Sequence, residues 1–109
     1  MTARERLPER RFHMTFQFEF DGQGYTAGVG YYSDGRPAEV FLNSPKIGAA
    51  VESLARDSAI LISLALQHGV TLSDLHHVLT RDVRGSAMGL AGHVVGLLAQ
   101  VTPKSEWCL

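Results

Sequence analysis

The sequence has only one cysteine, and its five histidines do not show the spacing of metal ligands. Its single cysteine, Cys108, cannot form an internal disulfide bond or a thiolate metal cage. Two histidines that share a ligand on a helix are spaced three or four residues apart, whereas His76 and His77 are adjacent and point in different directions. We therefore predict no metal site, no cofactor and no catalytic residue, and we expect no activity of the isolated chain.

The sequence also lacks long apolar runs and a large net charge of either sign. The longest apolar run is far shorter than the ~20 residues of a membrane span, and the net charge of −1 creates no broad field for nucleic acid. The N-terminal segment MTARERLPERR has no apolar core, so we expect no secretory signal and a cytoplasmic protein. Its arginines are diluted by Glu5 and Glu9, which favours a flexible, solvated tail over residues 1–11.

Alternating residues predict three strands at the start of the domain. From Phe12 to Asp21 every second residue is phenylalanine or methionine, up to the turn, and the residues between them are polar. Turn chemistry at residues 21–24 and 33–36 separates this strand from Tyr25–Tyr32 and then from Ala38–Asn43. These segments predict a three-stranded antiparallel meander.

The stretch from Ala49 to His68 predicts a long helix around which the rest of the chain is organised. Its second half, Ala59 to Leu66, is apolar except at Ser63, so we expect this helix to be buried on nearly all sides. Gly69 is suited to the left-handed residue that ends a helix.

Two shorter helices are predicted to follow. Thr71 and Asp74 have the spacing of a capping box at the start of a helix that ends near residues 80–81. A third helix is predicted over residues 87–101, and we expect its glycines to let it approach the long helix closely; they are Gly89, Gly92 and Gly96. The fold class is therefore α+β, with a three-stranded sheet packed on a long central helix and two shorter helices beside it. One domain spans residues 12–101, and residues 102–109 form a C-terminal tail.

Two places are candidate binding sites. Ser44, Lys46 and Gly48 precede the long helix, where backbone amides and a cation suit an anion or phosphate, although ordinary helix capping explains Ser44 as well. Gly28 and Gly30 leave one face of the second strand bare, which favours a close approach by a partner or a simple bend of the strand.

Three motifs at matching distances resemble the TSCPD family. They are GRP-x-EVF-x-N from Gly35, K-x-G from Lys46 and ISLAL-x-x-GV from Ile62, and the likeness covers most of the chain from Tyr25 to Leu98. Members occur towards the C-terminus of adenosylcobalamin-dependent (class II) ribonucleotide reductases and as short free-standing proteins. The naming motif of the family would fall on Ser86-Ala87-Met88-Gly89, where Ala87 replaces the cysteine, so any thiol or metal role of that motif is lost here.

The resemblance implies an accessory domain related to deoxyribonucleotide synthesis, non-catalytic alone, that contacts a reductase subunit or a nucleotide phosphate near Ser44, Lys46 and Gly48. A second hypothesis is a small homodimeric structural protein without a ligand. Its interface would be formed by Gly28, Gly30, Tyr32 and Phe41. A third, a stand-alone enzyme, needs a pocket that joins His68, His76 or Cys108.

Overall fold

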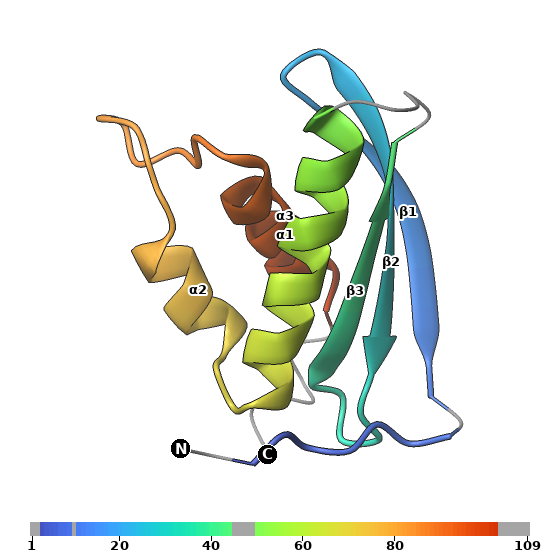
Figure 1. Cartoon of the computed structure of the whole chain (residues 1–109). Helices are drawn as coiled ribbons and strands as arrows, with labels where there is room; N and C mark the ends of the chain where they lie inside the picture. Colours follow the sequence, from blue (N-terminus) through green and yellow to red (C-terminus); the bar gives the residue numbers. More distant parts are fainter. Residues whose placement is uncertain (1–2, 10, 45–49, 103–109) are drawn as a thin grey trace.

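A computed structural model describes residues 3–9, 11–44 and 50–102 of the chain. Three strands precede three helices in the order β1 (His13–Phe20), β2 (Gln23–Tyr31), β3 (Pro37–Asn43), α1 (Ala50–Gln67), α2 (Leu72–Val78) and α3 (Leu90–Val101). The strands form one antiparallel sheet with the spatial order β1-β2-β3, so the predicted α+β meander is confirmed (Figure 1).

Two glycine turns set the register of the sheet. Asp21 and Gly22 both have positive φ angles, 52° and 75°, and this two-residue turn places Phe20 opposite Gln23. In the second turn Gly35 has a φ of 91°, and the Tyr32 amide donates to the Arg36 carbonyl at 2.8 Å. Both hairpins lie where the sequence predicts them.

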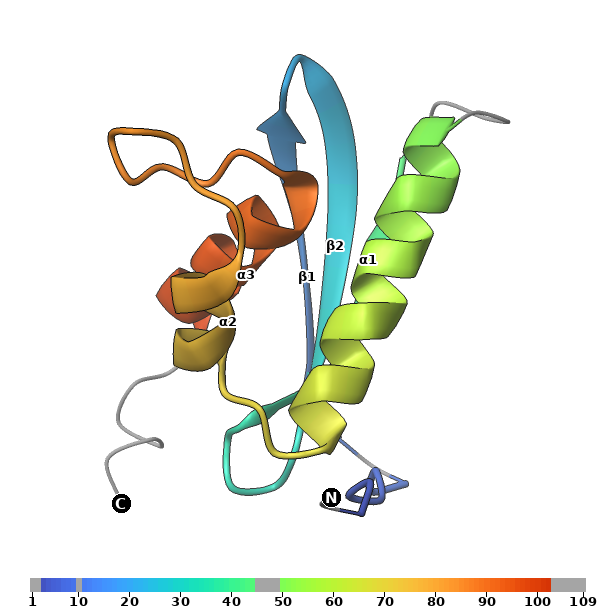
Figure 2. The ribbon, with the colours of Figure 1, turned by 60° about the vertical axis from the view of Figure 1, so that its left-hand side comes forward.

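Helices α1 and α3 cover the same face of the sheet (Figure 2), and no helix of the described residues covers the opposite face. The inward-facing residues of β2 and β3 are almost fully buried against these helices. The core comprises Tyr25, Ala27, Val29, Tyr31, Val40 and Leu42 from the sheet, Ala55, Ala59, Ile62 and Leu66 from α1, Leu72 from α2, and Leu90, Val94, Val95 and Leu98 from α3. The alternation that predicted the strands therefore divides the core face from the open face.

The end of α1 and the start of α2 follow the local chemistry of the sequence. Gly69 has a φ of 92°, and the Val70 amide reaches back to the Ala65 carbonyl at 3.0 Å, as in a Schellman motif. Two residues later, the Thr71 hydroxyl accepts from the Asp74 amide, and the Asp74 carboxylate accepts from the Thr71 amide. The predicted C-terminal glycine and capping box are both confirmed.

The prediction that α1 is buried on nearly all sides is wrong. Ile60, Leu61 and Leu64 are 51%, 67% and 37% exposed, and Leu54 is 58% exposed. The sheet takes only the stripe of α1 that contains Ala59 and Ile62, and no described segment lies over the outer side of the helix. Helix α1 is therefore a surface helix with an apolar outer face rather than the centre of the molecule.

Helix α3 begins later than predicted and uses its glycines differently. Ala87 forms an isolated antiparallel bridge with Arg81 in the connector from α2, so the helix begins at Leu90. A Cβ atom at Gly92 would lie 3.2 Å from the Ala87 side chain, whereas Gly96 faces open space. The close approach at Gly92 is to this connector and not to α1.

The described N-terminal residues lie against the body of the protein. The Glu5 amide donates to the Gln67 carbonyl at 2.6 Å, and the Tyr32 hydroxyl donates to the Glu5 carbonyl at 3.2 Å. The segment for which the sequence predicts a solvated tail is thus in contact with α1 and with the β2–β3 turn. Among the described helices, none is long and apolar enough to cross a membrane.

Candidate functional site

Large apolar residues are exposed on the outer side of α1 and at one position of β3. Ile60 and Leu64 line the same groove as Phe41, which is 52% exposed, and Leu61 adjoins Ile60 on the helix. We call these four residues the α1–β3 surface. Single exposed apolar residues are normal on a protein surface, whereas a group of large ones is a candidate interaction site.

A groove of about 520 Å³ lies at the surface where α1 meets β3. One side consists of β3 residues 39–43, and the other carries Arg56, Ile60 and Leu64 of α1, with Arg4 from the N-terminal segment also contributing. Arg56 additionally donates to the Glu52 carboxylate at 3.0 Å. The groove therefore combines apolar contact area with two cations, which suits binding better than bond-making chemistry.

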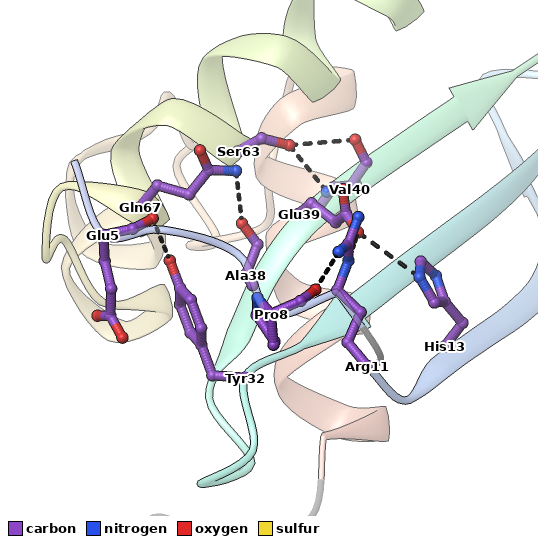
Figure 3. Close-up of polar contacts among 10 residues, drawn as sticks. All are labelled: Glu5, Pro8, Arg11, His13, Tyr32, Ala38, Glu39, Val40, Ser63 and Gln67. Atoms are coloured by element: carbon purple, nitrogen blue, oxygen red, sulfur yellow. Dashed lines mark hydrogen bonds and ion pairs between the residues drawn. The ribbon is translucent and has the colours of Figure 1, made fainter.

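Two polar side chains of α1 close the free edge of β3 beneath this groove. The Ser63 hydroxyl accepts from the Val40 amide at 2.8 Å and donates to the Val40 carbonyl at 3.2 Å (Figure 3). One turn later, Gln67 Nε2 donates to the Ala38 carbonyl at 2.9 Å. These hydrogen bonds take the place of those that a fourth strand would make to β3, and they hold α1 beside β3. The signal in the sequence was the polar residue that interrupts an apolar run, followed by another polar residue four positions later.

The N-terminal segment adds a second polar layer at the same end. Arg4 donates to Gln67 Oε1, and Arg11 donates to the Glu39 carboxylate on the open face of the sheet. His13 Nε2 lies 3.6 Å from the same Glu39 oxygen, and Glu39 is only 7% exposed (Figure 3). The buried carboxylate is therefore paired, as burial of a charge requires.

Arg36 joins the N-terminal segment to the β2–β3 turn. Its guanidinium donates to both Glu5 oxygens at 3.0 and 2.9 Å and lies over the Tyr32 ring at 4.7 Å. Burial, and then the Glu5 carboxylate, raise the pKa of Tyr32. Hydrogen bonds to Glu5 and then to Asp34 raise the pKa of Arg36. Burial alone would raise the pKa of Asp34, but hydrogen bonds from Arg36 outweigh it and lower that pKa. These shifts describe an ion-pair network that fixes the turn.

The predicted anion site lies only partly within the described residues. Lys46 and Gly48 are outside them, and the described part of α1 begins at Ala50. Ser44 is half-buried, and its hydroxyl accepts from Gln23 Nε2 at 3.1 Å. The phosphate contact therefore stays a prediction.

The predicted glycine interface is only partly assembled. Gly28 and Phe41 are adjacent on the open face, but Tyr32 is 6% exposed and lies under Arg36. A Cβ atom at Gly30 would lie 2.6 Å from Glu39 Oε2, so that part of the strand is covered and not bare. Glycine at this position makes room for the Glu39 carboxylate.

The histidines are not brought together into a reactive centre. His68 and His77 each contact the carbonyl of the residue four positions earlier, and His93 contacts the Phe18 and Phe20 rings. Within residues 3–9, 11–44 and 50–102, no three histidine, cysteine, aspartate or glutamate side chains are grouped as metal ligands would be. Cys108 lies outside the described residues.

The positions of the expected family motif lie in the connector between α2 and α3. The Asp82 carboxylate accepts from the Arg84 and Ser86 amides at 2.9 Å, and the Asp82 amide donates to the Ser86 carbonyl at 2.8 Å. Val83 at the tip is fully exposed, and Met88 is 59% exposed. The connector is thus a small hairpin held by Asp82, with no thiol at Ala87.

Comparison with known families identifies the class of this domain. The profile of the TSCPD domain matches residues 2–101, and the chain belongs to the TSCPD domain family. No solved structure matches the chain.

The chain is similar to several vitamin B12-dependent ribonucleotide reductases. Identity is 39% over 74 residues with the protein of Bradyrhizobium diazoefficiens, covering 68% of this chain and 6% of the reductase. With the protein of Rhodopirellula baltica it is 40% over 70 residues, covering 63% of this chain and 7% of the reductase. The reductase of Agrobacterium fabrum is 39% identical over 71 residues, 65% of this chain and 6% of its own length. The chain therefore matches only a small part of these long proteins.

Proposed function

We propose that this chain is a non-catalytic accessory domain of the B12-dependent ribonucleotide reductase type, which binds a reductase subunit through the α1–β3 surface. The observation that carries the proposal is the exposed apolar group formed by Phe41, Ile60, Leu61 and Leu64. In the relatives, a domain like this one is joined to more than nine-tenths of additional chain. A surface of this kind is suited to packing against such a neighbour. A role in deoxyribonucleotide synthesis would place the chain in the cytoplasm.

The decisive measurement is binding of the full chain to a B12-dependent ribonucleotide reductase from its own organism, for example by calorimetry. We expect Leu61→Asp to weaken binding by about tenfold or more, because it places a charge on the apolar surface that the partner would cover. Leu61 is 67% exposed in the free chain, so the variant is expected to fold.

The matched control is Val78→Asp, which puts the same charge on an exposed apolar residue of α2. Val78 is 77% exposed and lies outside the α1–β3 surface. We expect its affinity to stay within about twofold of the wild-type value. Equal loss in both variants, or no binding by the wild-type chain, would refute the proposal.

The proposal includes a nucleotide phosphate contact before α1, near Ser44, Lys46 and Gly48. Support comes from the cation and hydroxyl in the sequence and from the family relationship. We expect nucleoside diphosphates to raise the melting temperature of the full chain and Lys46→Ala to abolish that rise. Arg84→Ala, which removes an exposed cation from the α2–α3 connector, is the control and should leave the rise unchanged. A flat melting temperature for the wild-type chain would eliminate this contact while leaving the protein interaction intact.

A further inference from the structure

The two edges of the sheet differ in the hydrogen bonding of their outward backbone groups. The outward backbone groups of β3 at Ala38 and Val40 bond to α1 side chains. On the other edge, the Tyr31 amide donates to the Phe12 carbonyl, so even-numbered residues of β1 bond to β2 and odd-numbered ones direct their amides and carbonyls outward. Within the described residues, β2 is the only segment that hydrogen-bonds to the backbone of β1.

The open edge of β1 has few of the features that normally prevent strand pairing, and Glu19 is its one formal charge. Its register with β2 runs without a bulge from His13 to Phe20, and the strand contains neither proline nor lysine. Natural proteins cover, interrupt or charge such an edge, or they pair it with another strand. A straight edge of this length is therefore suited to a partner strand.

The side-chain order of β1 suits pairing with a second copy of the same strand. The outward residues His13, Thr15, Gln17 and Glu19 are placed symmetrically about Phe16. In an antiparallel pairing centred on Phe16, His13 of each copy lies opposite Glu19 of the other, and Thr15 lies opposite Gln17. A register centred on Gln17 would instead place His13 opposite Asp21, which has a positive φ in the turn and cannot continue the strand.

In the same register, the apolar side chains on the core face of β1 meet those of the second copy. Met14, Phe16 and Phe18 are only partly buried, whereas Ala27 and Val29 on β2 are fully buried. Pairing centred on Phe16 sets this ring against its own copy and Met14 against Phe18, which removes further apolar surface from water. Backbone hydrogen bonding, polar side-chain pairing and apolar contact thus coincide in one arrangement.

We propose that two copies of this chain pair through their β1 edges, in an antiparallel register centred on Phe16, to form one continuous sheet. A two-fold axis perpendicular to the sheet keeps the helices of both copies on one face and leaves both α1–β3 surfaces free. This interface differs from the glycine face that the sequence predicted, because side chains of Glu39, His13 and Phe41 cover that face.

The test measures the mass of the full chain by sedimentation equilibrium from about 1 to 100 μM. We expect a dimer for the wild-type chain and a monomer for Gln17→Pro at every concentration. Proline at this position removes an outward amide without breaking a bond to β2, which an edge strand tolerates. A wild-type chain that is monomeric throughout, or a folded Gln17→Pro chain that dimerises like the wild type, would overturn the proposal.

A charge variant keeps the test decisive if Gln17→Pro does not fold. Glu19→Lys changes an exposed residue and removes the carboxylate that faces His13 of the other copy, so the dimer should dissociate at least about tenfold more readily. The control Glu9→Lys makes the same change at an exposed residue outside the strand and should have no effect. Equal effects of the two variants would contradict the register. Leu61→Asp should leave the dimer intact, so this result is independent of reductase binding.

Discussion

Replacing Ser63 with alanine should lower the free energy of unfolding by roughly 2 to 4 kcal/mol, because the Val40 amide and carbonyl both lose their partner. Val40 is 2% exposed, so water cannot readily satisfy these groups without opening the contact between α1 and β3. The loss is measured by urea denaturation of the full chain.

The control for this variant is Ser53→Ala on the exposed side of the same helix. Alanine is the better helix former, so this change should be neutral or stabilising by about 0.5 kcal/mol, and it calibrates the helix-propensity gain that Ser63→Ala also receives. Ser63→Thr retains the hydroxyl and should recover part of the loss. If Ser63→Ala is as stable as Ser53→Ala, the hydroxyl does not hold the edge of β3.

The parts of the fold that could be predicted from sequence are those fixed by neighbouring residues. The alternation of β1, the turn at Asp21 and Gly22, the Gly69 helix end and the Thr71 capping box each depend on residues close together in the chain. Such signals are local because a hydrogen bond or a backbone angle is set within a few positions. The class of fold followed from their order.

Apart from Phe41, which the sequence analysis names as an interface residue, the candidate site could not be predicted, because it depends on which sides of the elements meet. Leu61 and Ile62 are neighbours of similar hydrophobicity, yet Leu61 is 67% exposed and Ile62 is 4% exposed. Nothing in the local sequence shows that the sheet covers one stripe of α1 and leaves the adjacent one open. The anchoring role of Ser63 likewise requires knowledge that β3 is an edge strand.

The two proposed contacts use opposite edges of the sheet: the reductase contact lies at β3 and α1, and the dimer contact lies at β1. Ser63 and Gln67 seal the β3 edge with side chains of the chain itself, so an approaching partner meets apolar side chains of α1 there and not an open backbone. At β1 the backbone remains available and the exposed side chains are polar. A protein contact through side chains at one end and strand pairing at the other can therefore occur together in one assembly.

Replacing Leu98 with alanine should lower the free energy of unfolding by about 2 to 5 kcal/mol. Leu98 of α3 is 0% exposed in the core between the helices and the sheet, so its removal leaves a cavity in addition to the lost apolar burial. Urea denaturation monitored by circular dichroism measures the change, provided that the unfolding slope stays constant.

The matched control is Leu61→Ala, the same substitution in another helix at a residue that composition alone cannot distinguish from Leu98. Its side chain is 67% exposed, so truncation should change stability by no more than about 0.5 kcal/mol. The comparison also tests the fold against the expectation of a buried central helix, which requires both leucines to cost several kcal/mol. A large loss at Leu61 would mean that the outer face of α1 is covered in solution, and a small loss at Leu98 would contradict the packing of α3 on the sheet. If Leu61→Ala leaves stability unchanged but weakens binding to the reductase, the apolar outer face of α1 acts in recognition and not in folding.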